Sequence, residues 1–165
     1  MAAARKKSAR QSVTSGGGRP DRLTFFIDEC LGRKALPDAL RAVGHGVVLH
    51  HERFDPGTDD VQWLTALYDQ REAWVVLTKD KKIKKRPLEK QALMAAGLRV
   101  FALTAGELTI DAQAEAFVRG LRRIVRISKQ AGPYIARVTA GGDVQIVERP
   151  KPGLRKKRRM RVVSP

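Results

Sequence analysis

The sequence predicts an α/β domain built around a mainly parallel sheet. Short apolar runs of strand character alternate with segments of helical periodicity, and an aspartate follows two of these runs, at Asp28 and Asp80. Alternation of this kind is typical of parallel sheets, because a helix usually joins one parallel strand to the next. With 165 residues the chain is long enough for one domain with a substantial core.

Four apolar runs are predicted to be buried strands of this sheet. Each is short and rich in β-branched or aromatic residues. They are residues 23–27, 46–50, 74–78 and 98–103. Two further runs, 134–138 and 144–148, are joined by Ala140-Gly141-Gly142-Asp143 and predict a C-terminal β-hairpin. This hairpin could extend the sheet with antiparallel strands or form a dimer contact.

The helices are predicted from apolar spacing and from capping residues. They are expected at 36–43, 58–68, 87–96 and 109–126. Thr58 is expected to cap the second helix with its hydroxyl group, which puts Asp59 and Asp60 in the first turn. Thr109 is expected to cap the last helix in the same way.

Positive charge is concentrated at the two ends of the chain. The formal net charge is +16, from 33 basic and 17 acidic residues. Six of the basic residues lie within 1–22 and eight within 149–165, where the only acid is Asp21. These low-complexity ends have too little apolar surface to fold and are expected to be disordered basic tails that attract a polyanion.

The cysteine content and hydropathy predict an intracellular protein with no membrane partner. Cys30 is the only cysteine, which excludes an intrachain disulfide and a metal site built from cysteines. No apolar run approaches the length of a signal peptide core or the ~20 residues of a membrane span. A reducing, cytoplasmic location fits these features.

Acidic and basic residues together indicate a nuclease. Parallel strands end at one edge of a sheet, so Asp28 and Asp80 are expected to converge there, and Asp60 opens a helix between them. Carboxylates around a small volume bind Mg²⁺ or Mn²⁺, which can promote phosphodiester hydrolysis. A basic run surrounds Asp80 and is expected to bind the nucleic-acid backbone; it comprises Lys79, Lys81, Lys82, Lys84, Lys85 and Arg86.

Each of these residues also has an ordinary interpretation. A strand-end aspartate often accepts hydrogen bonds in a turn or cap, and an acid in the first turn of a helix is favoured by the helix dipole. Glu29 follows Asp28 directly and would point to the opposite side if the strand continued. Basic runs are commonly solvated surface.

In order and spacing, several segments resemble the PIN-like domains grouped with the VapC-type toxin ribonucleases of bacterial toxin–antitoxin pairs. They are FFIDE, GHGVVLH, PGTDDVQWL, WVVLTKDKKIKKRP and GLRVFAL. The resemblance covers about residues 23–127 and defines a PIN-like nuclease domain at 23–131. The hairpin at 132–148 is then an extension, and both tails lie outside the resemblance.

The resemblance implies a three-layer α/β/α sandwich that binds Mg²⁺ or Mn²⁺ and cleaves RNA. Asp28, Asp60 and Asp80 match the family's metal-binding acids, and Glu29 matches an acid often paired with the first. The family's usual fourth acid has no clear counterpart, and Lys82 stands where related domains carry another aspartate. The resemblance also implies a cognate antitoxin, and whether two chains pair stays open.

Two alternatives to a metal-dependent ribonuclease stay open. A catalytically degenerate module could bind RNA or DNA through the basic run and tails, which fits the missing acid and the high charge. A phosphoacceptor receiver domain also carries an acidic pair after its first strand, but it needs a lysine late in the sheet, which LRVFALTAGE does not offer.

Overall fold

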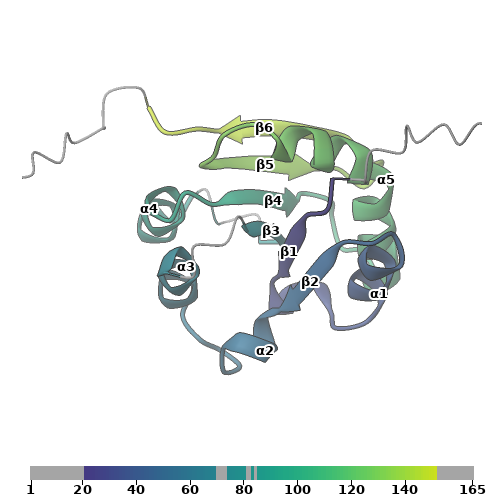
Figure 1. Cartoon of the computed structure of the whole chain (residues 1–165), viewed down its shortest axis with the longest axis horizontal. Coiled ribbons are helices and arrows are strands. Elements are labelled where there is room, and N and C mark those ends of the chain that lie inside the picture. Colours follow the sequence, from purple (N-terminus) through teal and green to yellow (C-terminus); the bar gives the residue numbers. More distant parts are fainter. Residues whose placement is uncertain (1–20, 70–73, 81–82, 84, 152–165) are drawn as a thin grey trace, which may run out of the picture.

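A computed structural model describes residues 21–69, 74–80, 83 and 85–151 of the chain. In these residues a six-stranded sheet lies between two layers of helices (Figure 1). The strands are β1 (Thr24–Ile27), β2 (Gly46–Leu49), β3 (Trp74–Thr78), β4 (Arg99–Leu103), β5 (Tyr134–Val138) and β6 (Val144–Glu148). The helices are α1 (Ala35–Ala42), α2 (His50–Arg53), α3 (Asp60–Asp69), α4 (Pro87–Ala95) and α5 (Ile110–Ser128), with a 3-10 turn, η1, at Glu29–Leu31.

The strand order is β2-β1-β3-β4-β5-β6. The first five strands run parallel, and β6 pairs antiparallel with β5. The predicted three-layer α/β/α sandwich with a mainly parallel sheet is therefore confirmed, and so is the C-terminal hairpin. Because β5 joins β4 in parallel, the hairpin continues the main sheet, and only its second strand is antiparallel.

Helices cover both faces of the sheet, which explains why the strands are apolar throughout. All five residues of β3 are buried. Phe25 and Leu77 belong to the core under α1 and α5, whereas Phe26 and Val76 belong to the core under α3 and α4 (Figure 1). Successive residues of a strand point to opposite faces, so an uninterrupted apolar run is needed to fill both cores.

The start of α3 differs from the prediction for Thr58. The Thr58 hydroxyl donates to the carbonyl oxygen of Asp55 at 2.6 Å, so it closes the preceding turn and does not cap the helix. Asp59 takes the capping role, since its Oδ1 accepts a hydrogen bond from the Val61 amide at 2.9 Å. The Thr58 hydroxyl is already engaged in the turn that contains Gly57, where φ is +76°, so it is not available to cap the helix.

The other element boundaries agree closely with the prediction. The Thr109 hydroxyl accepts a hydrogen bond from the Ala112 amide at 3.2 Å, as expected for a cap of α5. The strand expected at 46–50 ends one residue early, because His50 begins the short helix α2.

Most of the two predicted basic tails, namely residues 1–20 and 152–165, lies outside the described residues. Two ends that the structure does describe contact the domain. Asp21 forms an ion pair with Lys129 at 2.5 Å. The Arg149 guanidinium donates to Gln130 Oε1 at 2.7 Å and lies 5.3 Å from the centroid of the Tyr134 ring. None of the helices within the described ranges is long and apolar enough to cross a membrane.

Candidate metal centre

The register of β1 and β3 brings two of the predicted acids to one edge of the sheet. Ile27 pairs with Leu77, and the Asp28 amide donates to the Leu77 carbonyl oxygen at 3.0 Å. Asp28 therefore lies beside Thr78, and Asp80 follows two residues later. Because Phe26 and Val76 face α3 and α4, strand alternation puts Asp28 and Thr78 on that same face.

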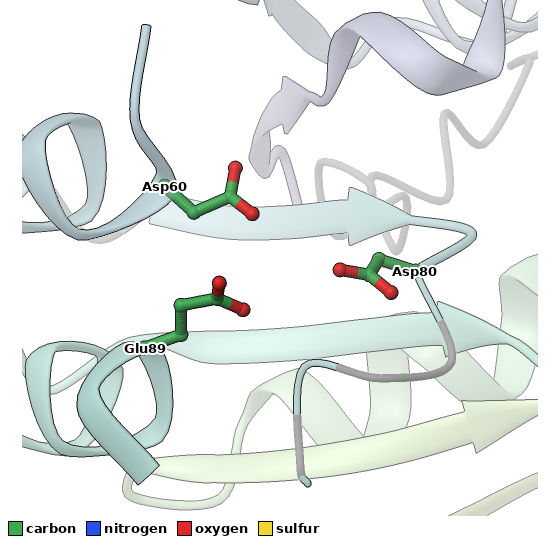
Figure 2. A group of neighbouring side chains, drawn as sticks. All are labelled: Asp60, Asp80 and Glu89. Atoms are coloured by element: carbon green, nitrogen blue, oxygen red, sulfur yellow. The ribbon is translucent and has the colours of Figure 1, made fainter. Parts of the chain in front are cut away.

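Two helices that begin above this edge each add an acid in the first turn. Asp60 is the first residue of α3, and Glu89 is the third residue of α4. Figure 2 shows their carboxylates directed toward that of Asp80. One oxygen from each of these three groups lies within 4.8 Å of the other two, and we call Asp60, Asp80 and Glu89 the acid cluster.

Asp60 is held in place by the core beneath it. The Trp63 indole nitrogen donates to Asp60 Oδ1 at 2.9 Å, and the indole stacks on Phe26 with the ring centroids 5.3 Å apart. The Trp63 side chain is fully buried. Its rigidity therefore fixes the orientation of the Asp60 carboxylate.

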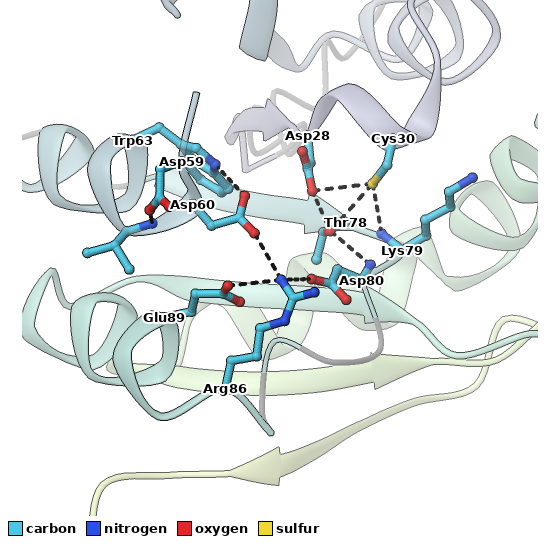
Figure 3. Close-up of polar contacts among 11 residues, drawn as sticks. Asp28, Cys30, Asp59, Asp60, Trp63, Thr78, Lys79, Asp80, Arg86 and Glu89 are labelled. Carbon is cyan, nitrogen blue, oxygen red and sulfur yellow. Dashed lines mark hydrogen bonds and ion pairs between the residues drawn. The ribbon is translucent and has the colours of Figure 1, made fainter. Parts of the chain in front are cut away.

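Asp28 lies next to the acid cluster, outside it, and is held by two donors (Figure 3). Its Oδ2 accepts a hydrogen bond from the Thr78 hydroxyl at 2.7 Å and another from the Cys30 thiol at 3.3 Å. Burial raises the pKa of Cys30 to about 12, and the Asp28 charge adds to this rise, so the thiol stays protonated and donates. Burial raises the pKa of Asp60, and the charge of the nearby Asp28 adds to this rise.

Thr78 connects Asp28 to Asp80. Its fully buried hydroxyl donates to Asp28 and also accepts a hydrogen bond from the Asp80 amide at 3.0 Å. One hydroxyl thus sets the position of two acids. No feature of the apolar run WVVLT marked this residue in advance.

Replacing Thr78 by valine is expected to destabilise the protein by about 1–3 kcal/mol, because the Asp28 carboxylate and the Asp80 amide each lose a partner. The shape of the side chain is preserved. Urea denaturation in the presence of a chelator measures the effect. The control is Thr65→Val, because the exposed Thr65 hydroxyl donates within its own helix, to the Val61 carbonyl oxygen at 2.6 Å. An equal loss of stability in both variants would contradict the linking role of Thr78.

The two carboxylate oxygens of Glu89 differ in their hydrogen bonding within the described residues. Its Oε1 accepts a hydrogen bond from Arg86 at 2.9 Å. Its Oε2 is buried and has no hydrogen-bond partner in the part of the chain that the structure describes. Burial raises the pKa of Glu89, and the hydrogen bond from Arg86 opposes this rise. An unpaired buried carboxylate oxygen is costly unless a cation or a proton satisfies it.

A guanidinium group occupies the middle of the acid cluster. Arg86 Nη1 lies 2.9 Å from the Glu89 carboxylate and 3.6 Å from each of the Asp60 and Asp80 carboxylates (Figure 3). All three acids therefore share one positive group. The three carboxylates therefore stabilise a positive charge between them.

The acid cluster is expected to lose its affinity for divalent ions on mild acidification. Burial raises the pKa of Asp60 and of Glu89. Both groups therefore hold a proton more tightly in the folded than in the unfolded protein, so the metal-free protein loses stability as the pH rises from the ordinary toward the raised pKa. A divalent ion needs the ionised carboxylates, so its stabilising effect grows over the same window.

The measurement is the melting temperature at a series of pH values, with Mn²⁺ and with chelator. We expect the increase in melting temperature caused by Mn²⁺ to be full at neutral pH and to fade as the pH falls through the raised pKa values of Asp60 and Glu89, before it reaches the ordinary range of carboxylic acids, about 4. An increase that stays constant down to that ordinary range would contradict the raised pKa values.

The remaining predicted site residues are more scattered. Glu29 lies in η1, with its Oε2 3.7 Å from Nδ1 of the buried His50, and it is not part of the acid cluster. In the predicted basic run, Lys79 and Lys85 are exposed, whereas Arg86 is half-exposed and faces the acids. The other three members, Lys81, Lys82 and Lys84, lie outside the described residues.

A hollow of about 370 Å³ adjoins the acid cluster at Asp80. Its lining includes Ile83, Ala102 and Ile135, with Arg137 and Thr104 as polar members. This volume lies within the range of ligand-binding pockets. The hollow therefore offers room for a substrate group directly beside the candidate metal centre.

Comparisons with known proteins identify the family of the chain. The sequence profile described as "PIN like domain" matches residues 23–105, which is half of the chain. A protein of Mycobacterium tuberculosis (strain ATCC 25618 / H37Rv) named "Putative ribonuclease VapC45" is 22% identical over 127 residues, covering 74% of this chain and 91% of that protein. No solved structure matches the chain. With its parallel sheet and its acids at the carboxyl edge, the chain belongs to the PIN-like domain family.

Proposed function

We propose that this chain is a divalent-metal-dependent endoribonuclease that hydrolyses phosphodiester bonds of RNA. The observation that carries the proposal is the acid cluster, with carboxylate oxygens of Asp60, Asp80 and Glu89 within 4.8 Å of one another on a PIN-like fold. The choice of RNA rests on the family resemblance and on the relative named as a putative ribonuclease.

The residues of the cluster fit Mg²⁺ or Mn²⁺. Both ions prefer oxygen ligands, and the cluster supplies carboxylate oxygens from three sides. Glu89 Oε2 is buried without a hydrogen-bond partner among the residues described, as expected of an oxygen reserved for a cation. The Arg86 guanidinium lies among these three carboxylates, which stabilise its positive charge. Asp60, Asp80 and Glu89 would hold the ion, with the Asp28 charge close behind them.

Such an ion would supply Lewis acidity and a water activated at neutral pH. The chain's own residues supply position and charge. Trp63 orients Asp60, and Thr78 orients both Asp28 and Asp80. Lys79 and Lys85 are exposed on the segment around Asp80 and would attract the RNA backbone. Water would attack the phosphorus, the P–O bond to the leaving ribose oxygen would break, and that oxygen would take up a proton from solvent while the attacking water loses one, so no protein nucleophile is needed.

The hollow beside Asp80 would receive a nucleotide next to the cleaved phosphate. Its lining is mixed: Ile83 and Ile135 offer apolar contacts to a base, and Arg137 lies exposed among the polar lining residues. The hollow and the acid cluster share Asp80. Binding at the hollow would therefore place a neighbouring phosphate at the carboxylates.

We further propose that the protein is the toxin of a toxin–antitoxin pair and acts in the cytoplasm. Support comes from the motif resemblance to VapC-type toxins. The formal charge of +16 makes an acidic segment of an antitoxin a suitable inhibitor, since it would cover the basic edge near Asp80. Pairing of two chains is compatible with this proposal and is tested by the mass of the protein in solution.

A second candidate function is binding of RNA or DNA without cleavage. The observation that favours it is the Arg86 guanidinium, which pairs with all three carboxylates and so supplies one positive charge to the cluster without an ion. The high positive charge supplies the affinity. Binding that weakens with salt, with no metal-dependent product, would favour this candidate.

The test of the proposed function is cleavage of a mixed RNA pool by the purified protein in Mn²⁺, in Mg²⁺ and in chelator. We expect discrete products in one or both metal ions and none in chelator. A well-folded protein that leaves the pool intact in both ions would refute the ribonuclease proposal and leave the binding module as the better account.

A further inference from the structure

Arg86 is placed at the centre of the acid cluster by its own helix. It is the N-cap residue of α4 and directly precedes Pro87, which begins that helix. Its carbonyl oxygen accepts a hydrogen bond from the Lys90 amide at 3.0 Å, so the backbone is fixed. Glu89, three residues further on, meets the guanidinium in the first turn, as residues at this spacing do on a helix.

The guanidinium and a metal ion would use the same three carboxylates. Arg86 Nη1 lies 2.9 Å from Glu89 Oε1 and 3.6 Å from an oxygen of each of Asp60 and Asp80. Mg²⁺ binds oxygen ligands at about 2.1 Å. An ion at that distance from these oxygens would collide with Nη1 and be repelled by its charge. The two cations therefore exclude each other.

We propose that Arg86 is the internal cation of the metal-free acid cluster, that a divalent ion displaces it, and that the released guanidinium binds an RNA phosphate. The inference rests on the proposed function and goes beyond it, because it makes metal entry a competition with a residue of the chain. Arg86 would pair first with the acid cluster and then with an RNA phosphate.

The side chain is suited to this exchange. It is half-exposed and makes no side-chain hydrogen bond that caps the helix, so the guanidinium can leave without disturbing α4. A guanidinium stays charged at any physiological pH and matches the geometry of phosphate oxygens. Because the backbone stays fixed, the released group remains at the mouth of the cluster, where the scissile phosphate must lie.

The competition has a consequence for metal binding alone. If the ion must displace Arg86, removing the guanidinium removes a competitor of the ion for these carboxylates. We expect Arg86→Ala to bind Mn²⁺ about tenfold more tightly than the wild type, since the lost competitor makes a charge-assisted hydrogen bond and two further ion pairs. Arg86→Lys keeps the charge but not the planar fork, and its affinity should lie between the two.

The measurement is a calorimetric Mn²⁺ titration of the full-length protein without RNA. Lys90→Ala is the matched control, because it removes one positive charge from the same helix while its ammonium pairs with Glu148 at 2.6 Å instead of the cluster. We expect the affinity of this control to stay within about twofold of the wild type, as for an exposed ion pair. Equal tightening in Lys90→Ala and Arg86→Ala would overturn direct competition.

The second measurement separates the phosphate role from the metal role. With saturating Mn²⁺, Arg86→Ala should raise the KM for RNA about tenfold even though its metal affinity has risen, because a charge-assisted contact to phosphate is lost. Opposite changes in metal affinity and KM support the exchange. An unchanged KM would overturn the phosphate role. An unchanged or weaker Mn²⁺ affinity would overturn the competition, and this second outcome can be measured whether or not the protein cleaves RNA.

Discussion

Replacing Asp80 by asparagine is expected to lower the rate of RNA cleavage about a thousandfold, which corresponds to about 4 kcal/mol of lost transition-state stabilisation. The asparagine keeps the size of the side chain but removes the charge that the Asp80 carboxylate adds to the acid cluster. The backbone amide of residue 80 can still donate to Thr78, so the loop should keep its path. The measurement is the initial rate of cleavage in Mn²⁺ under identical preparation.

The control for this variant is Asp111→Asn. Asp111 is an exposed acid in the first turn of α5, and α5 packs on the opposite face of the sheet. The Asp111→Asn variant should cleave RNA at the same initial rate as the wild type. Cleavage by Asp80→Asn at a rate close to that of the wild type would mean that Asp80 is outside the active site or that the activity comes from a contaminant.

Replacing Glu89 by glutamine is expected to weaken Mn²⁺ binding about a hundredfold. Loss of a partner that only supports a metal ligand already costs 10- to 100-fold, and Glu89 is proposed to be a ligand itself. The glutamine retains an oxygen that can accept the hydrogen bond from Arg86, so the start of α4 should be preserved. The measurement is a Mn²⁺ titration, with the melting temperature in chelator as the check on folding.

Glu115→Gln is the matched control for this change. Glu115 is an exposed glutamate of α5 that pairs with Arg119 at 3.2 Å, so it also has an arginine partner on its own helix. Its replacement should leave Mn²⁺ affinity unchanged. If Glu89→Gln binds Mn²⁺ as well as this control does, Glu89 is not a ligand and the metal centre must be built from other acids.

The convergence of Asp28 and Asp80 could be predicted because it follows from a single geometric rule. Both acids follow strands of a parallel sheet, and parallel strands end at the same edge. The pairing of Ile27 with Leu77 then fixes the relative height of the two residues. The strands themselves were predictable for a related reason, since burial on both faces demands the continuous apolar runs that the sequence displays.

Glu89 could have been found by the reasoning that selected Asp60. Each acid lies in the first turn of a helix that begins above the carboxyl edge of the sheet. The segment Arg86-Pro87-Leu88-Glu89 carries a signal for such a start, because proline is favoured in the first turn of a helix.

The roles of Thr78, Trp63 and Arg86 were beyond prediction from sequence. Thr78 ends an apolar strand and Trp63 lies among leucines, so both fit the core whether or not their polar atoms have a partner. Which acid receives the indole or hydroxyl hydrogen depends on how α3 packs on the sheet. Arg86 belongs to the predicted basic run, and only the packing of α3 against α4 determines that it faces three carboxylates.

Anomalous diffraction from a crystal grown with Mn²⁺ shows directly whether a divalent ion is bound jointly by Asp60, Asp80 and Glu89. The predicted result is an anomalous peak bound by oxygens of all three carboxylates, with the Arg86 guanidinium displaced from its present position. A saturating Mn²⁺ concentration with no peak among these carboxylates, and Arg86 still 2.9 Å from Glu89, would contradict the metal centre on which the proposed ribonuclease depends.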